Sequence, residues 1–169
     1  MNPVKLDAID VAIIDLLQQD GRVPASEIAC QVEGATERMV RYRIERLRQK
    51  GVINITAVVD PRSIGYSVVA DVMVEVEAGA IPNVVRRIAE LDRVTYASAA
   101  TGERDVSLQC VARSLDELHT FLLNVLQQIP GVRRTHTFTV PHPAKYIFNW
   151  KVPREVCCPE EQEEGGEDK

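Results

Sequence analysis

The chain has 169 residues, of which 45% are hydrophobic and 27% are charged, and its formal net charge is −5. No apolar run reaches the roughly 20 residues of a membrane helix, and the N-terminus lacks the apolar segment of a signal peptide. Four cysteines without C-x-x-C spacing fit neither a disulfide scaffold nor a zinc module. We therefore expect a cytoplasmic protein with one sizeable core or two small ones, and with no metal or cofactor.

The negative charge lies at the C-terminal end. Residues 154–169 contain seven acids and two bases and so carry the whole net charge, while the other 153 residues balance 18 bases with 18 acids. The segment from Pro159 onward has no apolar side chain, and we expect 154–169 to be a disordered acidic tail. The net acidity is therefore no argument against a nucleic-acid partner for the folded part.

Residues 1–60 predict three short helices followed by a strand. An amphipathic run follows Asp7, and a second helix is expected over 25–32. Thr36 is a good N-cap for a third helix that runs to about Lys50. Two helices joined by a tight glycine-containing turn are typical of a helix-turn-helix domain. The alternating apolar pattern of 52–59 then predicts a strand that ends this domain.

The third helix carries the side chains that point to DNA. Its apolar stripe consists of Val40, Ile44 and Leu47, so its other faces are expected to meet solvent. Six bases and two acids give residues 36–50 a local charge of +4, and five of these bases are arginines, which can bridge phosphates or bind guanine. A recognition helix in a major groove fits this pattern, and a solvated cationic helix face is the alternative. The predicted DNA contacts are Arg38, Met39, Arg41, Tyr42, Arg43 and Arg46.

A second domain is expected at 68–153, after a linker at 61–67. Two strand–helix–strand units follow one another there. The four strands are predicted at 68–78, 93–100, 105–112 and 133–140. A βαββαβ order gives a four-stranded antiparallel sheet with both helices on one face, so we predict an α+β protein with a ferredoxin-like second domain. Two helices leave the other sheet face open, and we expect a partner subunit to cover it, with the apolar segment 146–150 adding to that contact.

The loop Thr101-Gly102-Glu103-Arg104-Asp105 joins the two units. A glycine beside hydroxyl and charged groups can present backbone N–H groups to an anion, and the Asp105 carboxylate can accept a hydrogen bond from an ammonium group. An ordinary hairpin turn is the alternative.

The order of these features resembles the leucine-responsive regulatory protein/asparagine regulator (Lrp/AsnC) family of bacterial and archaeal transcription factors. The similarity covers about residues 5–142. The matching residues are Leu6, Asp7 and Asp10; Ile14, Leu17, Gln18, Asp20, Gly21 and Arg22; Glu27, Ile28 and Ala29; Val40, Arg43, Ile44 and Leu47; Gly51, Val52 and Ile53; Ala57 to Pro61 with Gly65; Thr101, Gly102 and Asp105; and Pro130, Gly131, Val132, Thr135 and Thr137.

The resemblance implies a helix-turn-helix joined to a ligand-sensing domain that forms dimers and often octamers. It also implies that a small effector, commonly an amino acid, binds between dimers beside the Thr-Gly-x-x-Asp loop. The effector contacts that it implies are Ser98, Thr101, Gly102, Glu103, Arg104, Asp105, Thr135 and Thr137. The partners would then be double-stranded DNA, the effector and further copies of this chain, with no membrane.

Two alternatives remain beside the DNA-binding regulator. Sirohaem decarboxylases share the two-domain plan, but no catalytic triad, phosphate loop or paired-carboxylate motif is evident, and we expect no enzyme. The other alternative is an effector-sensing interaction module without specific DNA binding, whose acidic tail binds basic partners or competes with DNA for the arginine-rich helix.

Overall fold

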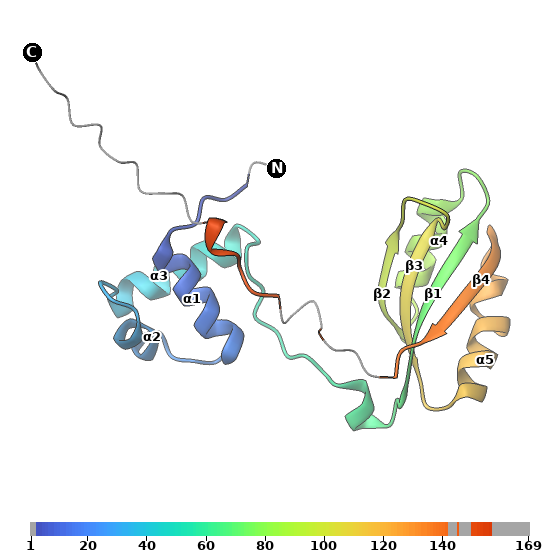
Figure 1. Cartoon of the computed structure of the whole chain (residues 1–169), viewed down its shortest axis with the longest axis horizontal. Coiled ribbons are helices and arrows are strands. Elements are labelled where there is room, and N and C mark those ends of the chain that lie inside the picture. The colour runs from blue at the N-terminus through green and yellow to red at the C-terminus, as the bar shows by residue number, and fades with distance from the viewer. Residues whose placement is uncertain (1–2, 142–144, 146–149, 157–169) are drawn as a thin grey trace, which may run out of the picture. The chain divides into compact units, whose positions relative to one another are not determined.

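The computed structural model describes residues 3–141, 145 and 150–156. Contacts divide the chain into two compact units (Figure 1). The N-terminal unit comprises Met1–Ala57 with Lys145–Lys169, and the sheet unit comprises Val58–Ala144. This division differs from the expected second domain at 68–153. Most of the predicted segment 146–150 and of the acidic tail lies outside the described residues.

The N-terminal unit contains the three predicted helices. They are α1 (Ala8–Gln19), α2 (Ala25–Gln31) and α3 (Glu37–Gln49). Thr36 is the N-cap of α3, as predicted, and its side-chain oxygen accepts a hydrogen bond from the backbone N–H of Met39. Gly34, in the turn between α2 and α3, has a φ of +73°, which a glycine adopts without strain. The helix-turn-helix prediction is confirmed.

The helix α1 is buried on two sides, whereas its sequence pattern predicted one apolar face. On one side Ile13 packs with Ile28 and Val40 of the other two helices. On the other side Val11 and Ile14 pack with Leu6 and Leu47, and segments before α1 and after α3 join that cluster. The α3 stripe is as predicted: Val40 and Leu47 are fully buried, and Ile44 packs against the cluster that contains Val40.

The strand predicted at 52–59 is absent, which corrects the expected trailing strand of this domain. Residues 53–60 form neither helix nor strand, and Ile55, Val58 and Val59 are exposed. A strand needs a hydrogen-bonding neighbour, and no described segment of the chain supplies one here. The expected linker at 61–67 contains a short 3₁₀ helix, Pro61–Ile64, that Gly65 ends.

The C-terminal segment 150–156 contacts α1 in the N-terminal unit. The backbone oxygen of Trp150 accepts a hydrogen bond from Gln18 Nε2 at 2.6 Å, and Arg154 forms an ion pair of 2.8 Å with Asp15. Between these contacts Val152 packs against the cluster of Leu6, Val11, Ile14 and Leu47. This segment therefore contributes to the core of the helix-turn-helix rather than to the sheet.

Val152→Ala is expected to lower the free energy of unfolding of the N-terminal unit by about 1 kcal/mol, because two methyl groups leave a partly buried site. Val156→Ala is the matched control, since Val156 is 42% exposed and its truncation should change stability by less than about 0.5 kcal/mol. Scanning calorimetry of the full chain measures both changes. Equal shifts for the two variants would show that the segment does not pack on the unit.

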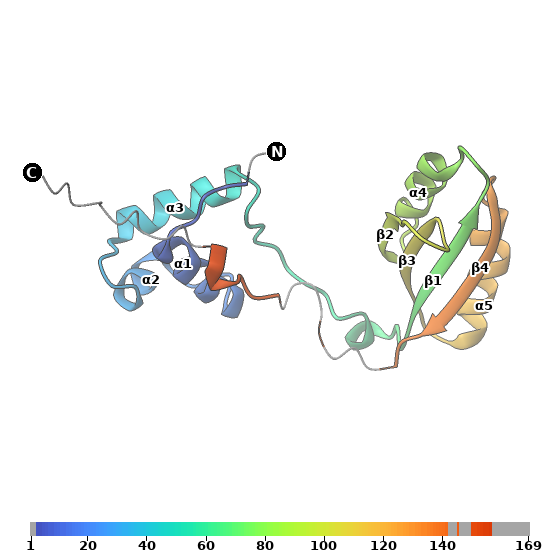
Figure 2. The same cartoon turned by 45° about the horizontal axis from the view of Figure 1, so that its top comes forward.

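The sheet unit has the predicted βαββαβ order. Its elements are β1 (Val68–Val76), α4 (Ile81–Ala89), β2 (Val94–Ala99), β3 (Val106–Ala112), α5 (Leu115–Asn124) and β4 (Val132–Thr139). All strand pairs are antiparallel, in the order β2-β3-β1-β4. Both helices pack on one face of this sheet (Figures 1 and 2). The ferredoxin-like prediction, and with it the α+β class, is confirmed.

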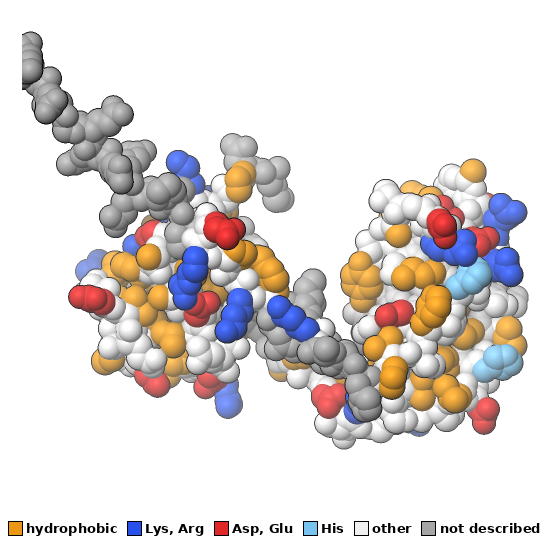
Figure 3. Space-filling view, viewed as in Figure 1, with side chains coloured by type: hydrophobic (Ala, Val, Ile, Leu, Met, Phe, Trp, Pro, Cys, Tyr) orange, Lys and Arg blue, Asp and Glu red, His pale blue; other side chains and the backbone are white. Residues whose placement is uncertain are grey.

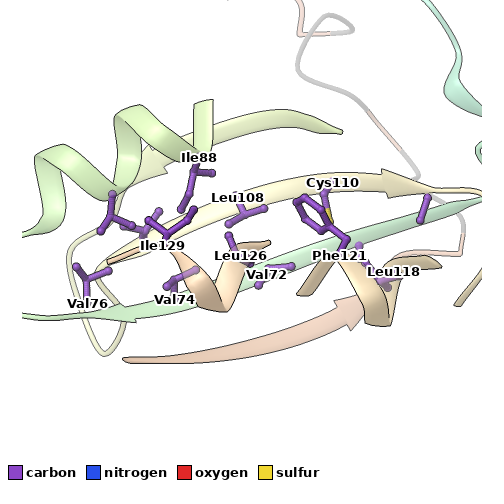
Figure 4. Close-up of a cluster of buried hydrophobic side chains, with 14 residues drawn as sticks. Val72, Val74, Val76, Ile88, Leu108, Cys110, Leu118, Phe121, Leu126 and Ile129 are labelled. Atoms are coloured by element: carbon purple, nitrogen blue, oxygen red, sulfur yellow. The ribbon is translucent and has the colours of Figure 1, made fainter. Parts of the chain in front are cut away.

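The core of the sheet unit lies between the sheet and its two helices. Val72 and Val74 of β1 and Leu108 of β3 point from the strands toward the helical layer (Figure 4). The helix α5 ends at Asn124, earlier than its apolar stripe indicates, and a 3₁₀ turn at Leu126–Gln128 carries Leu126 into the same core. None of the described helices is long and apolar enough to cross a membrane.

Candidate nucleic-acid interface and effector loop

One face of α3 is open to solvent and basic. Arg38, Arg41 and Tyr42 are exposed, and the Tyr42 side chain reaches 69% exposure although it is aromatic. Arg41 forms a 2.5 Å ion pair with Glu37 one turn earlier, and both side chains are about half exposed or more. An exposed pair of this kind contributes only about 0–1 kcal/mol, so Arg41 can exchange its carboxylate for a phosphate at little cost. The half-buried Met39 lies beside this face.

Arg43 and Arg46, which were also predicted to contact DNA, form ion pairs with carboxylates of the α1 region. Arg43 Nη1 lies 2.5 Å from Asp7 Oδ2 and 2.9 Å from Asp10 Oδ1, and Arg46 Nη2 donates to Asp10 Oδ2. Asp10 is 1% exposed, and the side chain of Arg43 is 17% exposed. Arg46 and Asp7 are partly exposed, so the buried group is Asp10. Leaving a buried carboxylate without any counter-charge costs about 3–5 kcal/mol, so the two arginines cannot both exchange Asp10 for a phosphate as readily as Arg41 exchanges Glu37.

These contacts change the charge of the predicted DNA-binding surface. Four of the six bases at 36–50 have a carboxylate partner among the described residues. Counting Asp7 and Asp10 with the two acids of the helix reduces the local charge from +4 to +2. The sequence did carry a signal, since two acids three residues apart at 7 and 10 match two arginines three residues apart at 43 and 46, one helical turn in each case.

The ion pairs of Asp7 predict that acid destabilises the N-terminal unit. Partial burial disfavours the charged carboxylate, but hydrogen bonds from Arg43 and the Asp10 N–H, with the charges of Arg43 and Arg46, outweigh it and hold the pKa of Asp7 below its ordinary value of 3.8. A depressed pKa contributes stability that is fully present above pH 3.8 and is lost as pH falls through the folded-state value. Urea unfolding between pH 7 and 3 should show this loss, and Asp7→Asn should remove part of it. If the variant lost stability as steeply with falling pH as the wild type, the assignment of this loss to Asp7 would be contradicted.

The predicted effector loop is the turn that joins β2 to β3. Thr101, Gly102 and Glu103 are exposed, and Gly102 has a φ of +137°. Asp105 is engaged within the fold, since its carboxylate accepts the backbone N–H of Val76 at 2.8 Å beside an irregularity in the β1–β4 pairing. It therefore holds the loop against β1.

Two basic side chains contact one carboxylate on the face of the sheet that the helices leave open, and a third basic residue lies opposite it on β4. Arg104 Nη1 lies 2.8 Å from Glu75 Oε1, and His136 Nε2 lies 3.5 Å from the same oxygen. Arg134 is the cross-strand partner of Glu75. Sequence reasoning missed Glu75 and His136, although the strand alternation places both on this face. Apolar side chains gather over the same face, and a cluster of basic and acidic side chains with one histidine lies toward one end of it (Figure 3).

The other predicted effector residues lie on opposite faces of the sheet. Ser98 pairs with Ser107, which pairs with Met73, so Ser98 lies on the open face. Thr135 and Thr137 pair with Val74 and Val72, whose side chains are in the core, so they lie on the helix-covered face. The Thr135 hydroxyl accepts a hydrogen bond from Gln127 there. Within one chain the structure does not bring Ser98 together with these threonines.

The described residues contain no group of three or more His, Cys, Asp or Glu side chains that could hold a metal ion. The side chains at the two places can form ionic contacts and hydrogen bonds: the basic helix face with phosphates and base edges, and the polar loop with a small charged molecule.

Known proteins match both units. Residues 6–48 match the AsnC-type helix-turn-helix domain, and residues 69–146 match the Lrp/AsnC ligand binding domain. The HTH-type transcriptional regulator FL11 of Pyrococcus horikoshii is 38% identical over 138 residues, which cover 81% of this chain and 90% of that protein. The structure of Escherichia coli AsnC is similar with a TM-score of 0.77 at 27% identity, covering 83% of this chain and 95% of that one.

A transcriptional regulator of Neisseria meningitidis, solved in complex with L-methionine, has the same fold. Its TM-score is 0.79 at 23% identity, and the match covers 88% of this chain and 96% of that one. The two family matches and the sequence identity to FL11 confirm the resemblance drawn from the sequence: the chain belongs to the Lrp/AsnC family of transcriptional regulators.

Proposed function

We propose that this regulator binds double-stranded DNA with the exposed face of α3, through Arg38, Met39, Arg41 and Tyr42. The observation that carries the proposal is the division of this helix into a fully buried apolar side and an exposed side with arginines and a tyrosine. Arginine and tyrosine side chains can donate to phosphates, and arginine can also bind guanine in the major groove. Arg43 and Arg46 hold α3 against the α1 region through their ion pairs.

We propose that the protein acts as a homodimer or as a larger assembly such as an octamer. Phe138 and Tyr96 on the open sheet face are 61% and 55% exposed, and Val58 and Val59 are exposed as well. Burying such apolar area against a second copy is favourable. A dimer presents two copies of α3, which suit half-sites about one helical turn of DNA apart.

The effector proposed here is an amino acid that binds beside the loop at 101–105. The loop exposes a hydroxyl, a glycine and a carboxylate at the end of the sheet, close to the guanidinium of Arg104. The methionine complex of the Neisseria regulator supports this class of ligand. Such an effector acts by binding one assembly or one spacing of the DNA-binding units more tightly than another.

Selection from a pool of random-sequence DNA duplexes tests the DNA-binding proposal. The full chain should enrich pseudo-palindromic duplexes whose half-sites are about one helical turn apart. Failure to enrich any sequence, with only weak and salt-sensitive retention of the pool, would contradict it.

Thermal unfolding in the presence of each of the 20 amino acids tests the effector proposal. A ligand of the folded state raises the unfolding temperature by mass action, so one or a few amino acids should stabilise the sheet unit. No shift with any of them would contradict an amino-acid effector. Titration with a tetrapyrrole tests the proposal that the chain is not an enzyme of the sirohaem decarboxylase type, because an absorption shift would contradict it.

A further inference from the structure

The carboxylate of Asp10 is the one charged group that is fully buried among the described residues. Both of its oxygens are engaged: Oδ1 accepts from Arg43, and Oδ2 accepts from Arg46 and from the backbone N–H of Asp7. The Asp7 side chain in turn accepts the N–H of Asp10 at 2.8 Å and caps α1. The hydrogen bonds with Asp7 therefore orient the Asp10 carboxylate independently of its contacts with α3.

Two arginines of α3 converge on this carboxylate from successive turns of the helix. Arg43 also contacts Asp7, so that two acids and two bases form one neutral group. Two contacts one turn apart fix the rotation of α3 about its axis, and this rotation decides which side chains face outward. Arg38, Arg41 and Tyr42 are on the outward side.

The remaining arginines of α3 with acidic partners are bound differently. Arg41 and Arg48 pair with Glu37 and Glu45 of the same helix, and all four side chains are about half exposed or more. Those pairs can open toward a DNA phosphate while both charges stay hydrated. Arg43 and Arg46 could do so together only by leaving Asp10 buried without a counter-charge.

We propose that Asp10, assisted by Asp7, is a positioning residue that withholds Arg43 and Arg46 from DNA phosphates and so raises sequence specificity. Phosphate contacts strengthen binding to every sequence equally, whereas base contacts discriminate between sequences. Keeping two arginines away from the phosphates lowers non-specific affinity, while the outward side of α3 still reaches the bases. This inference rests on the proposed DNA-binding role of α3.

Asp10→Asn tests the proposal, because it keeps the shape of the side chain and removes the charge that holds the two arginines. Binding is measured by fluorescence anisotropy with two probes, the duplex selected by the wild type and a random-sequence duplex of equal length, across a KCl titration. The variant should bind the random duplex on the order of 10-fold more tightly at low salt. The slope of log K against log salt should steepen by about 0.9 for each phosphate that a released arginine neutralises.

The matched control is Asp15→Asn, which makes the same change of charge on α1 but releases Arg154, an arginine outside α3. Its salt slope should equal that of the wild type. The triple variant Asp10→Asn/Arg43→Gln/Arg46→Gln should also return to the wild-type slope, because the released arginines are then absent. A merely structural role would weaken binding to both duplexes without steepening either slope.

Far-UV circular dichroism establishes that each variant is folded. If Asp10→Asn unfolds, Asp7→Asn carries the test, because it removes one of the two acceptors of Arg43 and leaves Asp10 in place. Its slope should then exceed that of Asp15→Asn. A folded variant with an unchanged slope and an unchanged ratio of specific to non-specific affinity would overturn this inference and leave the proposed function standing. A wild type that selects no duplex would instead overturn the proposed function.

Discussion

Replacing Gly131 by alanine is expected to destabilise the sheet unit by about 2–5 kcal/mol. Gly131 has a φ of +96°, a left-handed conformation that costs an L-residue about 1–2 kcal/mol. An added Cβ would lie 2.7 Å from Ala80 Cβ and 3.3 Å from Val84 Cγ2. Overpacking of this kind costs a further 1–3 kcal/mol or so. The carbonyl oxygen of Gly131 also accepts the N–H of Glu77 at 2.8 Å, so a shift of this turn disturbs the end of β1.

Gly79→Ala is the matched control for this prediction. Gly79 has a similar φ of +82°, but nothing lies within 4 Å of its added Cβ, so only the backbone cost of about 1–2 kcal/mol remains. Scanning calorimetry should show the larger loss for Gly131→Ala, confined to the transition of the sheet unit. Equal losses for the two glycines would show that the close approach to Ala80 and Val84 has no energetic consequence.

Arg38→Ala combined with Arg41→Ala is expected to weaken binding to the selected duplex by at least about 100-fold at low salt. A good arginine contact to a base contributes about 1–3 kcal/mol, and each 1.4 kcal/mol is a factor of ten. A dimer would be deprived of both arginines in both half-sites. Both side chains are exposed, so the fold should not change.

The matched control for the DNA prediction is Arg86→Ala combined with Arg87→Ala. These two arginines are also neighbours on an exposed helix face, but they belong to α4 of the sheet unit. The double change removes the same net charge from the protein. If the α4 variant lost as much affinity as the α3 variant, binding would depend on overall charge rather than on the surface of α3.

The sheet unit was predictable from the sequence because its strands have one face in the core and alternate with a period of two. On β1 the core residues are Val72, Val74 and Val76, which are every second residue of the strand, and Leu108 of β3 lies in the same core. The helix α1 was harder, since a helix buried on two sides has no single stripe. Val11 and Ile14 pack against Leu47 and segments distant in sequence, which the local pattern does not reveal.

The candidate sites were predictable as segments but not as sets of side chains. At 100° per residue, Arg43 falls on the flank of α3, and the sequence does not show whether a flank meets solvent or a carboxylate of another helix. Strand register likewise separates Ser98 from Thr135, although the family resemblance grouped them. The strand predicted at 52–59 depended on a pairing neighbour, which an apolar alternation does not specify.

The salt dependence of DNA binding tests most directly the account that α3 carries two kinds of arginine. Arg38 and Arg41 are exposed, whereas Arg43 and Arg46 are tied to Asp10. In one KCl titration with the random-sequence duplex, Arg38→Ala/Arg41→Ala should flatten the slope of log K against log salt relative to the wild type, and Asp10→Asn should steepen it. The slope changes by about 0.9 for each phosphate contact that a variant loses or gains. Slopes that move in the same direction, or that both equal the wild-type slope, would contradict the account.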